Sequence, residues 1–453
     1  MYSVLPIIVN NDSPLWQYCE ENSCRAKNLY NAALFRIRQI FTARGKESLT
    51  ENEQEVMDEL KKMTEAGYRK VKRVISYNAL ERLMRITDNP DFFAGLPMQT
   101  SQAIVKQATA DFKNWLAALK DYGAFPDKYT GKPRMPHYKK SDMTTFIITN
   151  QDAVLKNGVL KLPKTKLTLD VSNLNGSDVR LKEVKVIPYY GKFIISLTTE
   201  CDDVPLRDDL TGMAAVDFGT DNFAAIVSTD LNCRIYKGGA ILSENRRFAM
   251  KRSKAVSAIT KGHEHMHADS RRLKNLSLKH DCFNRDQLHK ISRSIIEYCI
   301  EHRCGTLVLG VNRGWKQRSN IGRANNQKFV QMPIAKLKDK ILYKAAMAGI
   351  AVIEQEESYT SRADITMNDP MPVYGNDGPV PAFSGTRICR GLYRCADGLV
   401  INADCNGAAN ILRKAFPDAW GSCTDYRFLA SPEVYGFHRL NPKGIPVKRI
   451  GAA

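Results

Sequence analysis

Apolar residues recur at helical spacing through the first quarter of the chain, after a short apolar run over residues 2–9 that predicts a strand. Helices are predicted over residues 15–41, 52–66, 68–87 and 99–121. In the last of these helices one stripe holds Ile104, Ala108, Phe112, Trp115, Leu116 and Leu119. Residues 13–125 are therefore predicted to form a helical domain inserted after one strand.

The pattern changes to short alternating segments after residue 125. Strands are predicted over residues 144–149, 154–155, 159–162, 167–169, 184–189 and 192–199. So many short strands in succession are typical of an antiparallel barrel or sandwich. We expect the strand at residues 2–9 to complete it.

The hairpin over residues 212–228 opens a third region, in which a buried apolar strand ends at Asp217. A carboxylate there either binds a cation that offsets its desolvation or caps the turn that follows. Strands at 233–236, 305–310 and 349–358 alternate with helices at 237–293 and 335–347. A last helix has Asp404 near its start. This order predicts an RNase H-like α/β domain.

The charge changes the functional picture, because 67 Lys and Arg against 48 Asp and Glu give a net charge of +19. Such an excess favours a polyanionic partner, nucleic acid by default, over a basic enzyme without one. The positive charge is concentrated in two stretches, the basic, aromatic segment 128–140 and the helical region 237–293. Either stretch could instead be a solvated surface. The candidate contacts are Lys132, Arg134, Tyr138, Lys139, Lys251, Arg252, Arg271, Arg272 and Lys274.

Two absences in the sequence suggest where the protein works. No run of 18 apolar residues and no signal-peptide pattern occurs, so we expect no membrane segment and a cytoplasmic protein, bacterial or archaeal. The eleven cysteines are scattered without a CxxC pair, which is typical of buried thiols in a reducing compartment.

Several ordered motifs resemble one family. The hairpin motif VDFGTDN and the late helix NADCNGAANIL resemble the RuvC nuclease domain of TnpB proteins, the RNA-guided endonucleases of insertion sequences, which are related to type V CRISPR effectors. LPMQTSQAIVKQATADFKNWL and GKPRMPHYKK are similar to that family's recognition lobe and wedge. LHKISRSIIEYCIEHRCGTLVLG resembles its bridge into the central strand.

The resemblance implies a multidomain α+β fold. A helical recognition lobe is inserted in a β-barrel wedge, and an RNase H-like α/β RuvC domain with a small insertion follows. The implied boundaries are 1–12 and 126–210 for the wedge, 13–125 for the recognition domain, 211–358 for the nuclease domain, 359–400 for a degenerate zinc-ribbon-like insertion, and 401–453 for the C-terminal RuvC part and tail.

Carried over residue by residue, Asp217 matches the first catalytic aspartate and Asp404 the last. The family's central glutamate would stand at Gly310, so that carboxylate is missing. One interpretation moves it to the end of the next strand, where Glu357 is preferred to Glu356. The other interpretation is a nuclease-dead protein that binds DNA under RNA guidance as a repressor.

The implied cofactors are two Mg²⁺ ions, held by Asp217, Glu357 and Asp404, and a guide RNA. Double-stranded target DNA is the implied partner, cleaved beside a short adjacent motif. Trp315 could stack on a base beside Lys316, or simply pack. Zinc is not expected, because Asp364 and Met367 stand where the family has cysteines, and Cys389, Cys395 and Cys405 rebuild no CxxC pair.

Overall fold

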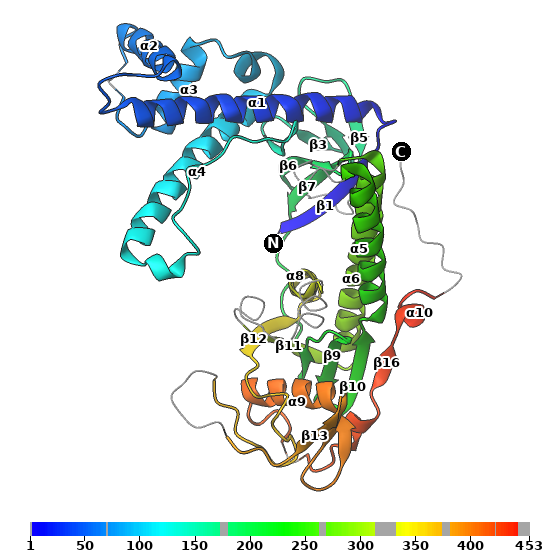
Figure 1. Cartoon of the computed structure of the whole chain (residues 1–453). Helices are drawn as coiled ribbons and strands as arrows, with labels where there is room; N and C mark the ends of the chain where they lie inside the picture. The colour runs from blue at the N-terminus through cyan, green and yellow to red at the C-terminus, as the bar shows by residue number, and fades with distance from the viewer. Residues whose placement is uncertain are drawn as a thin grey trace. The chain divides into compact units, whose positions relative to one another are not determined.

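The computed structural model describes residues 2–68, 71–172, 180–261, 269–312, 332–373, 381–421 and 423–442. The chain packs as two compact units, with residues 1–202 in one and residues 203–448 in the other (Figure 1). The architecture is a multidomain α+β one, as expected. None of the helices in the described part of the chain has the length and apolar character needed to cross a bilayer.

The helices of the first unit follow the predicted order with one difference. They are α1 (Pro14–Ala43), α2 (Glu51–Glu65), α3 (Tyr77–Ile86) and α4 (Met98–Ala124). The third was expected from residue 68, but it begins only at Tyr77, where the Ser76 side chain accepts the amide of Ala79 as an N-cap. Helix α2 begins with a complete capping box between Thr50 and Glu53.

The strands of the first unit form two antiparallel sheets. The larger has the order β1-β7-β6-β2 and contains β1 (Tyr2–Val9), β7 (Lys192–Glu200), β6 (Arg180–Tyr189) and β2 (Phe146–Thr149). The smaller contains β3 (Val154–Lys156), β4 (Val159–Lys161) and β5 (Thr168–Asp170). The first strand does join the later ones, along its whole length against β7. Among the described strands the larger sheet is open, so a closed barrel stays a prediction.

The second unit is built on a six-stranded mixed sheet with the order β12-β11-β8-β9-β10-β16. Its strands are β8 (Gly212–Asp217), β9 (Asn222–Ser228), β10 (Asn232–Lys237), β11 (Cys304–Val311), β12 (Ala351–Glu356) and β16 (Glu433–Tyr435). Strands β8, β11 and β12 run parallel, whereas β8, β9 and β10 form the expected antiparallel meander. The short β16 was not predicted.

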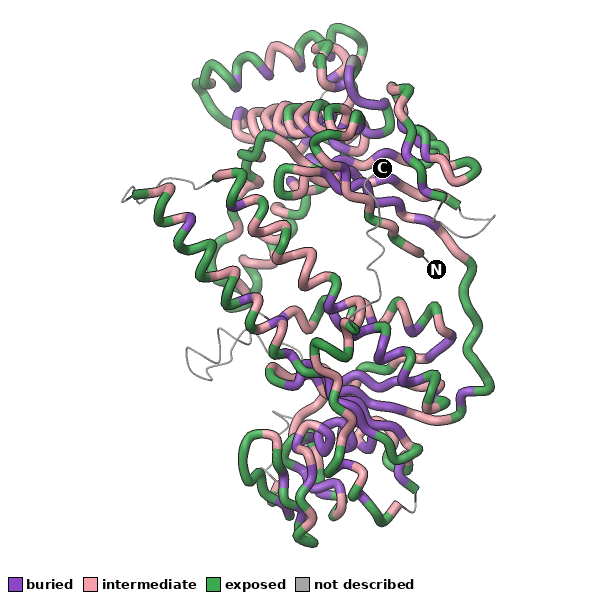
Figure 2. Tube along the Cα trace, turned by 90° about the vertical axis from the view of Figure 1, so that its right-hand side faces the viewer, coloured by how far each residue is buried: buried purple, intermediate pink, exposed green. Residues whose placement is uncertain are grey.

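Each face of this sheet packs against different helices. Ala214, Val216, Leu307 and Leu309 pack with α6 (Arg271–Glu301) and α8 (Ile334–Met347). The alternate positions, including Ala215 and Val308, pack with α9 (Ala403–Ala415). Figure 2 shows the buried stretches of this sheet between its covering layers. By the period-two alternation of strands, Asp217 and Gly310 belong to the face that α9 covers.

Two further parts complete the second unit. Helix α5 (Gly239–Thr260) packs along α6. The segment before α9 carries a small antiparallel sheet of β13 (Thr386–Cys389), β14 (Leu392–Arg394) and β15 (Val400–Asn402). We call residues 359–402 the finger.

Candidate active site

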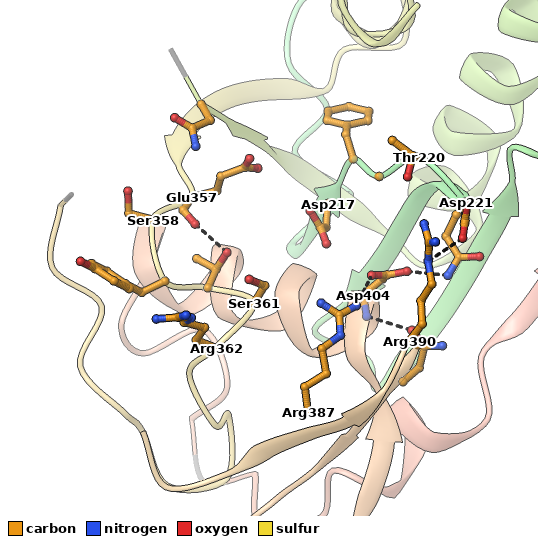
Figure 3. A pocket seen from close by; sticks show the side chains of 18 of the residues that line it. Asp217, Thr220, Asp221, Glu357, Ser358, Ser361, Arg362, Arg387, Arg390 and Asp404 are labelled. Atoms are coloured by element: carbon orange, nitrogen blue, oxygen red, sulfur yellow. Dashed lines mark hydrogen bonds and ion pairs between the residues drawn. The ribbon is translucent and has the colours of Figure 1, made fainter. Parts of the chain in front are cut away.

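A pocket of about 1090 Å³ opens at the carboxyl ends of the parallel strands. Asp217 is the last residue of β8, Glu357 directly follows β12, and Asp404 lies in the first turn of α9. All three line the pocket, and Figure 3 shows their side chains directed toward it from three different elements. The ends of the parallel strands β8 and β12 meet at one edge of the sheet, which brings Asp217 and Glu357 together. Helix α9 brings Asp404 to the same place.

Glu357 occupies the space that a side chain on Gly310 would need. Its Oε2 atom lies 2.8 Å from the point where a Cβ atom on Gly310 would stand. Real Cβ contacts are longer than this, so a side chain at position 310 and the present position of Glu357 exclude each other. The central strand lacks a carboxylate, and the carboxylate of Glu357 lies directly beside the empty position.

Glu356, the second candidate, is held elsewhere. Its Oε2 atom accepts Lys414 Nζ at 2.7 Å, and its Oε1 atom accepts both the amide and the hydroxyl of Ser358. Burial alone would raise the pKa of Glu356, but these hydrogen bonds lower it. Glu356 is absent from the pocket lining, and its charge is already matched by the Lys414 ammonium.

The carboxylates in the pocket repel one another. Burial raises the pKa of Asp217 well above its usual value, and the charges of Glu357 and Asp404 raise it further. Burial, together with the neighbouring charge of Glu356, raises the pKa of Glu357 to about 7. Burial is the larger cause of both shifts, and neighbouring negative charge adds to each. A bound cation would offset both effects.

Asp404 has polar partners that the sequence did not reveal. Asn222 Nδ2 donates to Asp404 Oδ2 at 2.5 Å, and Lys237 Nζ in turn donates to Asn222 Oδ1 at 2.8 Å. Arg387, from β13, lies 3.8 Å from Asp404 Oδ1. Asn222 stands in the quoted hairpin motif and could have been singled out there, whereas nothing in the spacing of Arg387 announced it.

Gly407 allows helix α9 to approach the end of β8. A Cβ atom on this residue would stand 2.8 Å from Asp217 Oδ2, so any side chain there would displace the carboxylate. A glycine inside a helix costs stability relative to alanine. Gly407 lets α9 approach Asp217 closely, a role that the sequence analysis did not identify.

The donors in the pocket are of the type that Mg²⁺ prefers, namely carboxylate oxygens without sulfur or imidazole. The repulsion between the carboxylates also fits a cation at this site. Within the described residues, however, no three His, Cys, Asp or Glu side chains stand close enough together to hold a metal ion as they are. The residue types in the pocket fit a divalent metal, but the described side chains are not close enough together to coordinate one.

The finger is held by carboxylates instead of thiolates. Asp364 is fully buried and accepts the amide and hydroxyl of Thr366 and the amide of Ala396, at 2.7 to 2.9 Å. Asp369 accepts the amides of Asp364 and Ser384 and the hydroxyl of Ser384. Asp364 thereby joins the segments around Thr366 and Ala396, and hydrogen-bonded carboxylates of this kind do not fit tetrahedral zinc.

The side chains predicted to contact nucleic acid differ in their exposure and in whether they already have a partner within the protein. Lys132, Arg134, Lys251, Arg252, Arg271 and Arg272 are exposed. Tyr138 is partly exposed beneath the guanidinium of Arg38. Lys274 pairs with Asp269 at 2.9 Å.

Lys139 is engaged inside its own unit. Its ammonium lies 4.1 Å from the ring centre of Tyr30 and donates to Thr144, and burial lowers its pKa. Trp315 and Lys316 lie outside the described residues.

Comparisons with known proteins point to the family that the motifs resemble. A family described as a probable transposase, OrfB_IS605, matches residues 196–316, and the Cas12f1-like TNB domain family matches residues 335–411. The CRISPR-associated endodeoxyribonuclease Cas12f1 of Sulfoacidibacillus thermotolerans is 30% identical over 172 residues. Over these stretches the chain is similar to TnpB and type V effector proteins. The two family matches together include Asp217, Glu357 and Asp404.

The similarity to whole relatives is partial. The match to Cas12f1 of S. thermotolerans spans 37% of this chain and 36% of that protein. A cryo-EM structure of a Cas12f1–sgRNA–target DNA complex is 14% identical, with a TM-score of 0.48 over 86% of this chain and 81% of the other. A CRISPR–Cas12f ternary complex is 13% identical, with a TM-score of 0.31 over 87% and 80%.

Proposed function

We propose that this protein is an RNA-guided DNA endonuclease that hydrolyses a phosphodiester of target DNA beside a short adjacent motif. The single observation that carries the proposal is the Glu357 carboxylate beside Gly310, since it replaces the one acid that the central strand lacks. The matched relative is an endodeoxyribonuclease, and the net charge of +19 suits guide RNA and double-stranded DNA as partners. In the finer architecture we propose, the first unit contains a barrel wedge and the second is RNase H-like.

Asp217, Glu357 and Asp404 are the proposed ligands of two Mg²⁺ ions. Bound there, such ions would activate water and stabilise the leaving oxygen of a phosphodiester. Asn222 fixes Asp404 by donating to Oδ2, which leaves Oδ1 facing the pocket and Arg387. Arg387 and Arg390 line the same pocket and are about half exposed, so they suit a phosphate group entering from solvent. The carboxylate side chains would turn inward to reach ligand distance.

The test is cleavage of a matched DNA target by the purified ribonucleoprotein in Mg²⁺. Glu357→Gln should lower the single-turnover cleavage rate by about 10³-fold while target binding persists. Glu354→Gln is the matched control, because Glu354 lies on the same strand but pairs with Lys338 of α8. A Glu357→Gln protein that cleaves at the wild-type rate would refute the proposed site.

A carboxylate exchange provides a sharper test. Glu357→Gly combined with Gly310→Glu returns the acid to β11, and Ile411→Val removes the Cδ1 atom that lies 2.6 Å from the new Cβ position. We call this triple variant the exchanged protein. Its cleavage rate should exceed that of Glu357→Gly alone by about 10-fold or more, because a carboxylate again reaches the pocket.

The alternative is a nuclease-dead, RNA-guided DNA-binding repressor. It is favoured by the lack, among the described residues, of any trio of side chains already positioned around a metal. Wild-type protein that carries RNA, binds the matched target and leaves it intact in Mg²⁺ would support the repressor. Protein that purifies without RNA would refute both.

A further inference from the structure

The segment that carries Glu357 is clamped on both sides by Lys414. The Lys414 ammonium donates to Glu356 Oε2 at 2.7 Å and to the carbonyl oxygen of Ser358 at 3.0 Å. These are the residues immediately before and after Glu357. The side chain of Lys414 is 10% exposed and that of Glu356 is 32% exposed, so the ion pair is partly shielded from water.

The same helix holds the rest of the turn. Thr360 Oγ1 donates to the carbonyl oxygen of Glu357 at 2.9 Å, and Asn410 Nδ2 donates to the carbonyl oxygen of Thr360 at 3.0 Å. Asn410 and Lys414 are four residues apart and therefore lie on one face of α9. Asp404 lies in the first turn of α9. The same helix therefore carries one carboxylate of the pocket and orients the segment that bears Glu357.

The Lys414 contact also sets the direction of the Glu356 side chain. Alternation along β12 puts Glu354 toward α8, where it pairs with Lys338, and would put Glu356 on that same side. Lys414 instead draws Glu356 toward α9, and the chain turns directly after it. The Glu357 carboxylate lies beside Gly310 instead.

A partly shielded ion pair of this kind often adds no stability beyond that of a well-packed apolar pair of the same size. We propose that Lys414 is a positioning residue for the Glu357 carboxylate. It fixes the Glu356 side chain and the backbone on both sides of Glu357, so that the Glu357 carboxylate faces Asp217. The inference rests on the proposed function, because it assigns Glu357 a metal.

The first test replaces Lys414 with methionine, which keeps the aliphatic volume and removes the ammonium. Single-turnover cleavage should slow by about 10- to 100-fold, the usual cost of removing a group that orients a metal ligand. Guide-RNA and target-DNA binding should be unchanged, and Lys414→Arg should recover most of the rate. Lys338→Met is the matched control and should cleave like the wild type. Wild-type cleavage by Lys414→Met would overturn the inference.

The exchanged protein separates positioning from general support of the fold. In that background the carboxylate comes from β11, so Lys414→Met should cost less than about twofold. An equal cost in both backgrounds would mean that Lys414 supports the fold rather than Glu357, and would overturn the inference.

A binding measurement makes the test independent of cleavage. Titration of the wild-type protein with MnCl₂, followed by calorimetry or by the Mn²⁺ resonance signal, should give an affinity about tenfold higher than that of Lys414→Met. Lys338→Met should bind Mn²⁺ like the wild type. Equal affinities for wild type and Lys414→Met would overturn the inference even if the exchanged protein is inactive.

The two proposals fail in different ways. Normal cleavage by Glu357→Gln refutes the proposed site, whatever Lys414→Met does. An inactive Glu357→Gln beside a fully active Lys414→Met refutes the positioning role alone.

Discussion

Two pairs of carboxylates, one buried and one half-buried, lie on the same side of the large sheet and differ in what surrounds them. Asp364 and Asp369, in the finger, each accept three hydrogen bonds from nearby amides and hydroxyls. Asp217 and Glu357, in the pocket, face other carboxylates, and burial and repulsion raise the pKa of both. Carboxylates that the chain itself satisfies hold structure, whereas carboxylates that it leaves unsatisfied are candidates to hold a ligand.

The largest effect should come from Asp217. Asp217→Asn removes a charge that the pocket repels, so cleavage should fall by at least about 10³-fold while the protein becomes no less stable. Single-turnover cleavage and the thermal unfolding midpoint measure the two quantities on one preparation. A large fall in the midpoint would put Asp217 among the structural carboxylates and break the comparison.

Asp364 should behave in the opposite way. Asp364→Ala leaves the amides and hydroxyl of the finger without a buried acceptor, so the free energy of unfolding should fall by about 3 kcal/mol. Denaturant unfolding followed by a probe in the second unit checks this.

A chelator supplies the control for the finger. Because hydrogen bonds to Asp364 and Asp369 join the segments of the finger, treatment with a strong zinc chelator should leave the thermal midpoint of the wild type unchanged. A lowered midpoint, restored by added zinc, would contradict the metal-free finger.

Gly407→Ala should have an intermediate effect on the cleavage rate, by changing the pocket alone. The new methyl group in Gly407→Ala would displace Asp217 Oδ2, so cleavage should slow by about tenfold although alanine is the better helix former. Gly239→Ala, at the start of α5, meets no atom within 4 Å and is the matched control. Equal cleavage by both variants would mean that Asp217 can move without loss.

The smallest effect concerns acid stability. Burial alone would raise the pKa of Asp369, but bonds from Ser384 and from the Asp364 amide lower it below its unfolded value. The stabilisation is therefore present above about pH 4, the usual pKa of an unfolded aspartate, and is lost as the pH falls further. Asp369→Asn should weaken the acid dependence of the free energy of unfolding between pH 5 and 3, by about 1 kcal/mol. An unchanged pH dependence of the free energy of unfolding in this range would show that Asp369 does not contribute to acid stability.

Local sequence was enough to predict much of the fold and part of the site. The period-two runs gave the strands from Phe146 to Glu200, and the apolar stripes gave the helices of the first unit, because both signals depend only on neighbours in the chain. Helix α3 began later than predicted, since a serine cap outweighed the helical pattern before it. The three-residue β16 carries too little pattern to be recognised.

The sequence by itself determined that Asp217 ends a buried strand, that Asp404 begins a helix, and that Gly310 brings no carboxylate. Strand alternation in the sequence preferred Glu357 to Glu356, and the tertiary structure added contacts between atoms far apart in the chain. Glu357 and Ile411 fill the space that a side chain on Gly310 would need, and the Lys414 ammonium binds Glu356. Strand alternation does not predict either contact, because each joins the end of β12 to a different element.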